Sequence, residues 1–471
     1  MTWGGFLSRS LSLIIVLPLV LTRLTTAEIA LWYLFSTIIS LQSLVDMGFS
    51  PTFTRVIAYA RGGVEAEDLD DLRKRKLLTI KAETNWETIE RICSTMRVVY
   101  IRLTLISVPC LILLGSWSLT KPISATETPI IAWTAWGTIL CVSTVSLLGN
   151  LYASYLRGLN QVALLGRWEI ITSLGAIFTS FLVLLFNGGL LGLVLANQSW
   201  RVLNILRNRF LCRYLFEKRF KAFRWNNTDT HIMSAVWPSA WRSGLGALMS
   251  YGLVQLSGVM YAQFGSVSNV ASYLLGLRFI QLISSFSQAP FYSKLPMLTT
   301  LRAQGEIQKL VYMAQRGMKL SYLSYALGFV GLGLFSKPLL QLIGSNADFP
   351  NSVLWSLMGL AVFIERYGAM HIQLYSITNH IIWHIANGIS GSIYLILSLI
   401  LFKYVEVYAF PIALLISYLS FYAWYCASYS YREYDLKFWI FERKTLLIPF
   451  AVMLSYSVCA FFPIFTLVKG L

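Results

Sequence analysis

Residues 352–376 read SVLWSLMGLAVFIERYGAMHIQLYS, an apolar run with the adjacent charges Glu365 and Arg366 near its middle. Such a run is long enough for an α-helix to cross the hydrocarbon core of a bilayer, which takes about 20 residues. An arginine at the centre of a spanning helix costs roughly 2.5–3.5 kcal/mol if it faces lipid. The stretch therefore predicts a membrane-spanning helix whose charged side chains face a polar interior.

Apolar runs of this kind recur along the whole chain. Of the 471 residues, 56% are hydrophobic and 13% are charged, whereas soluble domains carry about 25% charged residues. The runs lack the alternating pattern of outer-membrane β-strands. We therefore predict an all-α membrane protein with 12–14 transmembrane helices, thirteen being the best count. The predicted spans are 3–22, 29–50, 98–119, 129–156, 169–187, 189–206, 233–263, 267–291, 319–344, 352–376, 384–402, 405–428 and 446–468.

The basic residues are concentrated in alternate loops. Segments 61–97, 157–168, 207–232, 292–319 and 429–445 carry 8, 2, 7, 5 and 4 Lys and Arg residues. Basic loops stay cytoplasmic, so the N-terminus is predicted to be cytoplasmic. We expect the first span to be retained rather than cleaved as a signal peptide, because no charged region precedes it and Arg9 interrupts it.

The net charge of +17 is explained by this topology and by attraction to anionic lipid head groups. A nucleic-acid partner is not expected, because the basic residues are split among loops without a nucleic-acid-binding motif. Segment 61–97 has mixed charge, and the i,i+4 spacing of Glu87 and Arg91 predicts a pair on a helix there.

Three pairs of landmarks, repeated in the same order in both halves, indicate two six-helix lobes. They are Ser8–Ser10 with Trp241–Ser243, Ile29–Leu34 with Val270–Leu275, and Pro51–Arg55 with Pro290–Lys294. An even number of helices per lobe would relate the repeats by an axis along the membrane normal. The predicted parts are an N-terminal lobe (1–206), a basic amphipathic cytoplasmic linker (207–232), a C-terminal lobe (233–428), and a loop with an additional helix (429–471). The linker could anchor the chain at the interface or capture substrate.

Seven arginines lie inside or at the edges of the apolar stretches: Arg9, Arg55, Arg102, Arg201, Arg242, Arg278 and Arg366. Guanidinium groups bind phosphate oxygens in bidentate fashion and keep their charge when partly desolvated. We expect the pseudo-symmetric lobes to enclose a central cationic cavity that holds a pyrophosphate. Its predicted substrate-binding residues are Arg9, Arg55, Arg242, Arg278 and Arg366. The alternative is internal pairing with acids such as Glu169 or Glu433, and Arg102 and Arg201 could instead extend to the cytoplasmic boundary.

Two carboxylates, Asp46 and Glu365, lie within predicted spans. Intramembrane acids often relay protons or bind coupling ions, so these two are the candidates for coupling to an ion gradient. The alternative, that each carboxylate pairs with a neighbouring arginine, stays open.

Several function classes lack their motifs. The chain has no GxxxxGK[ST] nucleotide loop. Its six cysteines are scattered, and His380 and His384 have no evident third ligand, so no metal or cofactor is expected. The predicted outer loops are short and their acids dispersed, which disfavours a membrane-embedded polysaccharide polymerase. The pattern favours a transporter over an enzyme.

Three segments carry a resemblance to a known group of proteins. Glu28–Phe35 (EIALWYLF), Asp46–Arg55 (DMGFSPTFTR) and Arg157–Asn160 (RGLN) resemble the polysaccharide flippases of the multidrug/oligosaccharidyl-lipid/polysaccharide (MOP) superfamily, which include the O-antigen unit flippases of the bacterial inner membrane. The resemblance covers residues 1 to about 428. The thirteenth predicted span departs from the twelve or fourteen usual in that superfamily.

The resemblance implies export of an undecaprenyl-pyrophosphate-linked oligosaccharide, such as an O-antigen or other surface polysaccharide unit, by alternating access. In the related lipid II flippases, arginines of helices one, two and eight line the central cavity, and Arg9, Arg55 and Arg278 match these by position. The implied location is the bacterial cytoplasmic membrane, with membrane lipids and other polysaccharide assembly proteins as partners. A cation-coupled multidrug exporter is the alternative, which the basic rather than acidic residues in helices one and seven disfavour.

Overall fold

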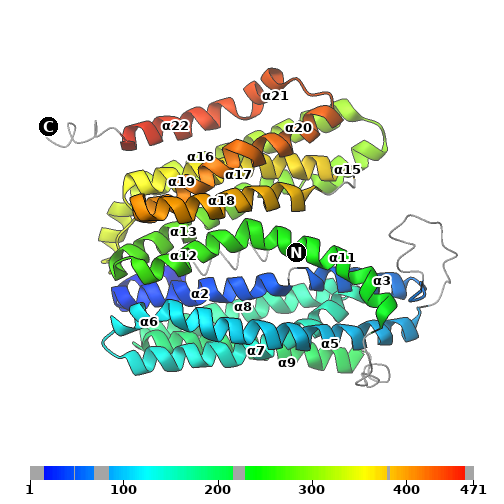
Figure 1. The fold of residues 1–471 in the computed structure, drawn as a ribbon, viewed down its shortest axis with the longest axis horizontal. Helices are drawn as coiled ribbons and strands as arrows, with labels where there is room; N and C mark the ends of the chain where they lie inside the picture. The colour runs from blue at the N-terminus through cyan, green and yellow to red at the C-terminus, as the bar shows by residue number, and fades with distance from the viewer. Residues whose placement is uncertain (1–14, 47, 68–83, 216–228, 379–381, 462–471) are drawn as a thin grey trace. The chain divides into compact units, whose positions relative to one another are not determined.

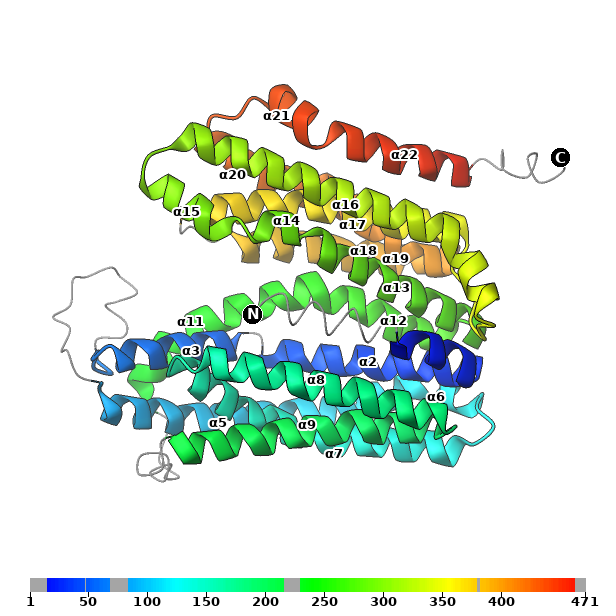
Figure 2. The same cartoon turned by 180° about the vertical axis from the view of Figure 1, so that it is seen from behind.

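The computed structural model describes residues 15–46, 48–67, 84–215, 229–378 and 382–461. These residues form helices and contain no β-strand, as predicted for an all-α membrane protein. The chain divides into two compact units, the first comprising Met1–Leu248 with Ala262–Val267, and the second Met249–Tyr261 with Ser268–Leu471. Within each unit the long helices run alongside one another, as both ribbon views show (Figures 1 and 2).

The first unit contains closely packed helices joined by tight turns. Gly149 on α7 lets α9 approach closely, because a Cβ at this position would lie 2.8 Å from the side chain of Ile205. Asn187 and Gly189 adopt positive φ angles of 55° and 61° in the tight turn that separates α8 from α9. The helices are α2 (Thr26–Asp46), α3 (Phe49–Arg61), α5 (Trp86–Cys110), α6 (Ser116–Ser124), α7 (Pro129–Gly158), α8 (Val162–Leu185), α9 (Gly189–Leu215) and α11 (Thr230–Ala247).

The second unit has an aromatic core where α16 meets α17. Phe329 stacks on Trp355 with ring centroids 5.2 Å apart, and Gly359 leaves the space that the Phe329 ring occupies. The helices are α12 (Leu253–Phe264), α13 (Val267–Ser287), α14 (Ala289–Tyr292), α15 (Leu295–Ala303), α16 (Ile307–Leu342), α17 (Ser352–Ser376), α18 (Trp383–Val405), α19 (Ala409–Ser417), α20 (Ala423–Glu433), α21 (Phe438–Thr445) and α22 (Leu447–Phe461).

Eight helices of the described ranges are long and apolar enough to cross a membrane, or ten if each of two bent pairs counts as one span. Thirteen spans were predicted, and the difference has three sources. The first predicted span lies largely in residues 1–14, outside the described ranges. The polar helix α9 is not among the eight, and the segment Trp383–Glu433 is one candidate that covers two predicted spans. The count of thirteen stays a prediction.

The second predicted span is interrupted near Pro51. α2 ends at Asp46 and α3 begins at Phe49, so the proline lies in the first turn of α3 rather than at a helix end. Proline is tolerated there because the first turn of a helix has no internal acceptor for its backbone N–H groups. The predicted span 29–50 is therefore divided between α2 and α3.

The helix that follows the predicted linker in the sequence is α11 (Thr230–Ala247). α11 packs against α3 in the first unit, where the rings of Phe49 and Trp237 lie 6.2 Å apart. A Cβ on Gly48 would collide with the carbonyl group of Ala240. By these contacts α11 belongs with the first unit. Residues 216–228 of the predicted amphipathic linker lie outside the described residues, and the two six-helix lobes stay a prediction.

Candidate functional site: charged groups inside the helical units

Arg366 forms a bidentate ion pair with its neighbour Glu365 on α17. Nε and Nη2 of the arginine donate to the two carboxylate oxygens at 2.6 and 2.7 Å. Nη1 donates to the side-chain carbonyl of Gln288 at 3.0 Å. Only 4% of the Arg366 surface is exposed. Glu365 is therefore paired with a neighbouring arginine, which was one of the two alternatives for it. Within this pair the carboxylate neutralises most of the positive charge of Arg366.

A cavity of about 110 Å³ adjoins this pair inside the second unit. Glu365 and Arg366 form part of its wall, together with polar side chains from α12 and α13 and with aromatic rings. A volume of this size holds a few water molecules, and the polar wall offers them hydrogen-bond partners. The polar and aromatic residues of the wall include Ser250, Gln255, Ser257, Tyr273, Gln281, Ser284, Tyr394, Phe410 and Tyr418.

Asp46 is a buried carboxylate in the first unit whose side-chain hydrogen bonds come from neutral groups. Tyr100 on α5 donates its hydroxyl to Oδ1 at 2.5 Å, and Asn150 on α7 donates its amide to Oδ2 at 2.7 Å. Next to it, Ser50 and Ser154 share a hydrogen bond of 2.7 Å. These contacts join α2 and α3 to α5 and α7. Asp46 therefore differs from Glu365, because hydroxyl and amide groups rather than a guanidinium satisfy its oxygens.

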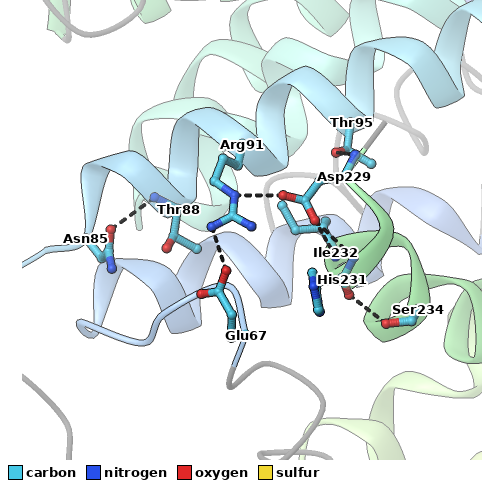
Figure 3. Close-up of polar contacts among 9 residues, drawn as sticks. All are labelled: Glu67, Asn85, Thr88, Arg91, Thr95, Asp229, His231, Ile232 and Ser234. Atoms are coloured by element: carbon cyan, nitrogen blue, oxygen red, sulfur yellow. Dashed lines mark hydrogen bonds and ion pairs between the residues drawn. The ribbon is translucent and has the colours of Figure 1, made fainter. Parts of the chain in front are cut away.

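Arg91 forms a second ionic cluster, shown in Figure 3. Its Nε lies 2.7 Å from Oδ2 of Asp229, and its Nη1 lies 2.8 Å from Oε1 of Glu67. Asp229 also caps α11, because its Oδ1 accepts from the backbone N–H groups of His231 and Ile232. The cluster joins α5 to α11 within the first unit. The i,i+4 spacing had predicted Glu87 as the partner of Arg91, whereas the structure pairs Arg91 with Glu67 and Asp229.

A third cluster lies around His371 on α17, which is completely buried. Its Nδ1 lies 2.6 Å from the Ser430 hydroxyl and its Nε2 lies 3.2 Å from Oε1 of Glu442. Tyr431 donates to the same carboxylate oxygen at 2.6 Å, and Thr445 donates to the other at 2.8 Å. These contacts attach α21 to α17 and α20. The only sequence signal for this cluster was a histidine in an apolar stretch.

The five arginines predicted to bind substrate have different surroundings. Arg9 lies outside the described residues. Arg55 on α3 and Arg242 on α11 are exposed on two helices that pack together in the first unit. Arg278 on α13 is partly buried and Arg366 on α17 is buried, both in the second unit. The described residues thus place two candidate arginines in each unit.

The other two intramembrane arginines are both exposed. Arg102 lies on α5 and Arg201 on α9, and no ion pair with a described residue is found for either. Their exposure fits the alternative in which long side chains extend to the membrane boundary.

No family model and no curated protein matches the sequence. Solved structures do match its fold over most of its length. The lipid II flippase MurJ in an inward closed conformation aligns with a TM-score of 0.59 and 15% identity, covering 97% of each chain. An inward-facing multidrug resistance MATE family transporter of the MOP superfamily aligns with a TM-score of 0.58 and 13% identity, covering 90% of this chain and 98% of that one. The crystal structure of a MATE point mutant aligns with a TM-score of 0.53 and 13% identity, covering 92% of this chain and 93% of that one.

These likenesses establish the fold. The chain has the all-α architecture shared by MATE transporters and the lipid II flippase, and its apolar helices make it a multi-pass membrane protein.

Proposed function

We propose that this protein is a flippase for an undecaprenyl-pyrophosphate-linked oligosaccharide, an O-antigen or other surface polysaccharide unit of the bacterial cytoplasmic membrane. The observation that carries the proposal is the set of arginines on helices of both units, joined to a fold shared with a lipid II flippase. An arginine that faces lipid is costly, so arginines placed within spanning helices suit an anionic cargo. A pyrophosphate offers the paired oxygens that guanidinium forks bind.

In this proposal Arg9, Arg55, Arg242 and Arg278 hold the pyrophosphate in a common cationic cavity. Arg366 is nearly neutralised by Glu365, so it contributes less to the field acting on the cargo. The lipid chain stays in the bilayer while the lobes change between inward-open and outward-open states. Binding of the cargo must favour the state that closes around it, since a ligand shifts an equilibrium only by its difference in affinity.

Asp46 and Glu365 are the proposed coupling residues. Asp46 suits proton or cation coupling better, because the side chains that donate to it are neutral and can remain in place when its charge changes. Glu365 would have to release Arg366 before it could bind an ion, and that separation is costly in a buried site.

A multidrug exporter is the second candidate, because two of the three matching structures above are MATE proteins. Cationic drugs need acidic binding groups, and Asp46 is one buried acid that could serve. The candidates differ in the sign of the cargo, and the arginines favour an anion.

The cellular test is surface glycan output in a strain that depends on this gene. Arg278→Ala and Arg55→Ala should lower output at least tenfold each, and Arg278→Lys should retain part of it because a charge remains. Arg102→Ala is the matched control, since Arg102 is exposed and expected to reach the membrane boundary. Normal output from Arg55→Ala, Arg278→Ala and the double variant would contradict the proposal.

A further inference from the structure

The second unit contains a large pocket beside α21, the helix that carries Glu442 of the His371 cluster. It lies where α21 and α22 meet, with Lys319 of α16 contributing to its wall. The two helices are bent by 63° at their junction, and the pocket has a volume of about 920 Å³. Its lining residues are Lys319, Phe438, Trp439, Ile440, Glu442, Arg443, Lys444, Leu446, Leu447 and Phe450.

The pocket wall carries an excess of positive charge. Lys319, Arg443 and Lys444 are exposed, and none of them forms an ion pair with a carboxylate in the described parts of the chain. Glu442 is the one acidic residue in the wall. It is 5% exposed, and its oxygens accept from Tyr431 and Thr445, so it points into the protein. The cations therefore lack a neutralising partner within this wall.

The rest of the wall is apolar and aromatic, and parts of it are strongly exposed. Trp439 is 78% exposed, and Ile440 and Leu447 are each more than half exposed. A tryptophan with adjacent arginine and lysine on a short helix that bends into an apolar helix is the pattern of a membrane interface. The basic segments 292–319 and 429–445 place this interface on the predicted cytoplasmic side.

We propose that this pocket binds one anionic glycerophospholipid of the cytoplasmic leaflet. The phosphate lies among Arg443, Lys444 and Lys319, where basic groups at the cytoplasmic ends of helices suit acidic head groups. The acyl chains lie along Leu447 and Phe450, which continue from the charged end of the pocket onto the apolar helix. The occupant is a membrane lipid rather than the transported cargo, so the inference holds whether or not the proposed transport function is correct.

The bound lipid is detected by native mass spectrometry of the full-length chain, released from detergent containing equal amounts of dioleoyl phosphatidylglycerol and dioleoyl phosphatidylcholine. Wild-type protein should retain phosphatidylglycerol at least tenfold over phosphatidylcholine. The triple variant Lys319→Gln, Arg443→Gln and Lys444→Gln should lose most of this preference, because each basic group contributes about fivefold at an anionic surface. All three positions are exposed, so the variant should elute as a monodisperse folded protein.

The matched control removes three exposed basic residues of the first unit that lie outside the predicted linker: Arg61→Gln, Arg102→Gln and Arg167→Gln. It should keep the wild-type preference. An equal loss in the control, or no loss in the pocket variant, would overturn the site. A further arm adds millimolar inorganic phosphate, which should leave the lipid bound because it cannot use the apolar wall. Displacement of the lipid by free phosphate would show a simple anion site and contradict the proposal.

Discussion

The guanidinium of Arg91 on α5 lies 2.7 Å from the carboxylate of Asp229, the residue that caps α11. The two residues are 138 positions apart in the sequence. The carboxylate thus makes two kinds of contact at once, an ion pair to one helix and hydrogen bonds to the first turn of another. Glu67 completes the cluster from the segment after α3. This arrangement fixes the start of α11 against α5 within the first unit.

Replacement of Asp229 by alanine should destabilise the protein. The change removes a helix cap, which contributes about 1 kcal/mol, and leaves the half-buried Arg91 paired with Glu67 alone in this cluster. We expect the apparent melting temperature in detergent to fall by a few degrees. Asp348→Ala is the matched control, because Asp348 is an exposed acid. Equal melting temperatures for Asp229→Ala and Asp348→Ala would contradict a stabilising role of Asp229 as the cap of α11.

The same cluster predicts a pH dependence. Burial raises the pKa of Asp229, but the hydrogen bonds from Arg91 and from the first turn of α11 outweigh it, and the pKa lies below its ordinary value of 3.8. The hydrogen bond from Arg91 likewise lowers the pKa of Glu67 below 4.5. A carboxylate with a lowered pKa stabilises the folded state at pH values above its unfolded pKa, and this contribution is lost as the pH falls through the folded pKa.

The melting temperature of the wild type should therefore decrease more steeply below about pH 4.5 than that of an Asp229→Asn/Glu67→Gln variant. Thermal unfolding followed by size-exclusion chromatography at several pH values measures the two slopes. If the melting temperatures of the wild type and the variant fall equally steeply with pH, neither carboxylate stabilises the folded protein through its charge.

Removal of Arg366 alone should destabilise the protein more than removal of both charges of the Glu365–Arg366 pair. Arg366→Ala leaves the carboxylate of Glu365 desolvated without its cation, which costs about 3–5 kcal/mol when a buried pair is broken. The double variant Glu365→Gln/Arg366→Gln removes both charges and should recover much of this loss. Gln288→Ala removes a single hydrogen bond and should cost about 1 kcal/mol. A double variant less stable than Arg366→Ala would contradict the account.

Glu442 should hold α21 in place. Glu442→Ala removes the acceptor of Tyr431 and Thr445 and leaves the buried His371 short of a partner. Arg443 and Lys444 are exposed trypsin sites on the same helix, so cleavage there should be several times faster in this variant. Asp348→Asn is the control, and cleavage of it should match that of the wild type. Unchanged cleavage of Glu442→Ala would show that packing alone holds α21.

The helices could be predicted from the sequence, whereas their polar contacts could not. Hydropathy is a local pattern, and the run 352–376 corresponds residue for residue to α17. The partners of Arg91 and His371 depend on contacts between segments far apart in the chain, which local spacing does not encode. Helical spacing predicted Glu87 as the partner of Arg91. In the folded unit Arg91 instead contacts Glu67 and Asp229.

The unit to which α11 belongs also depends on contacts between distant segments. Basic composition suggested a linker at 207–232, whereas the packing of the helix that follows it depends on the shapes of the surfaces in contact. The close approach of Gly48 to Ala240 assigns α11 to the first unit, and no hydropathy pattern reports such a contact. The pairing of Glu365 with Arg366 could be suggested from their adjacency, whereas the neutral groups that donate to Asp46 come from helices distant in sequence.

The central claim is that arginines of this fold bind the pyrophosphate of a lipid-linked sugar, and transport by the purified protein in proteoliposomes tests it most directly. A fluorescent undecaprenyl-pyrophosphate oligosaccharide is placed in one leaflet, and its transfer is measured beside the uptake of a cationic dye. The wild type should transfer the lipid and not the dye, Arg278→Ala should be at least tenfold slower, and Arg102→Ala should match the wild type. Uptake of the dye without lipid transfer, or equal rates for Arg278→Ala and the wild type, would contradict the account.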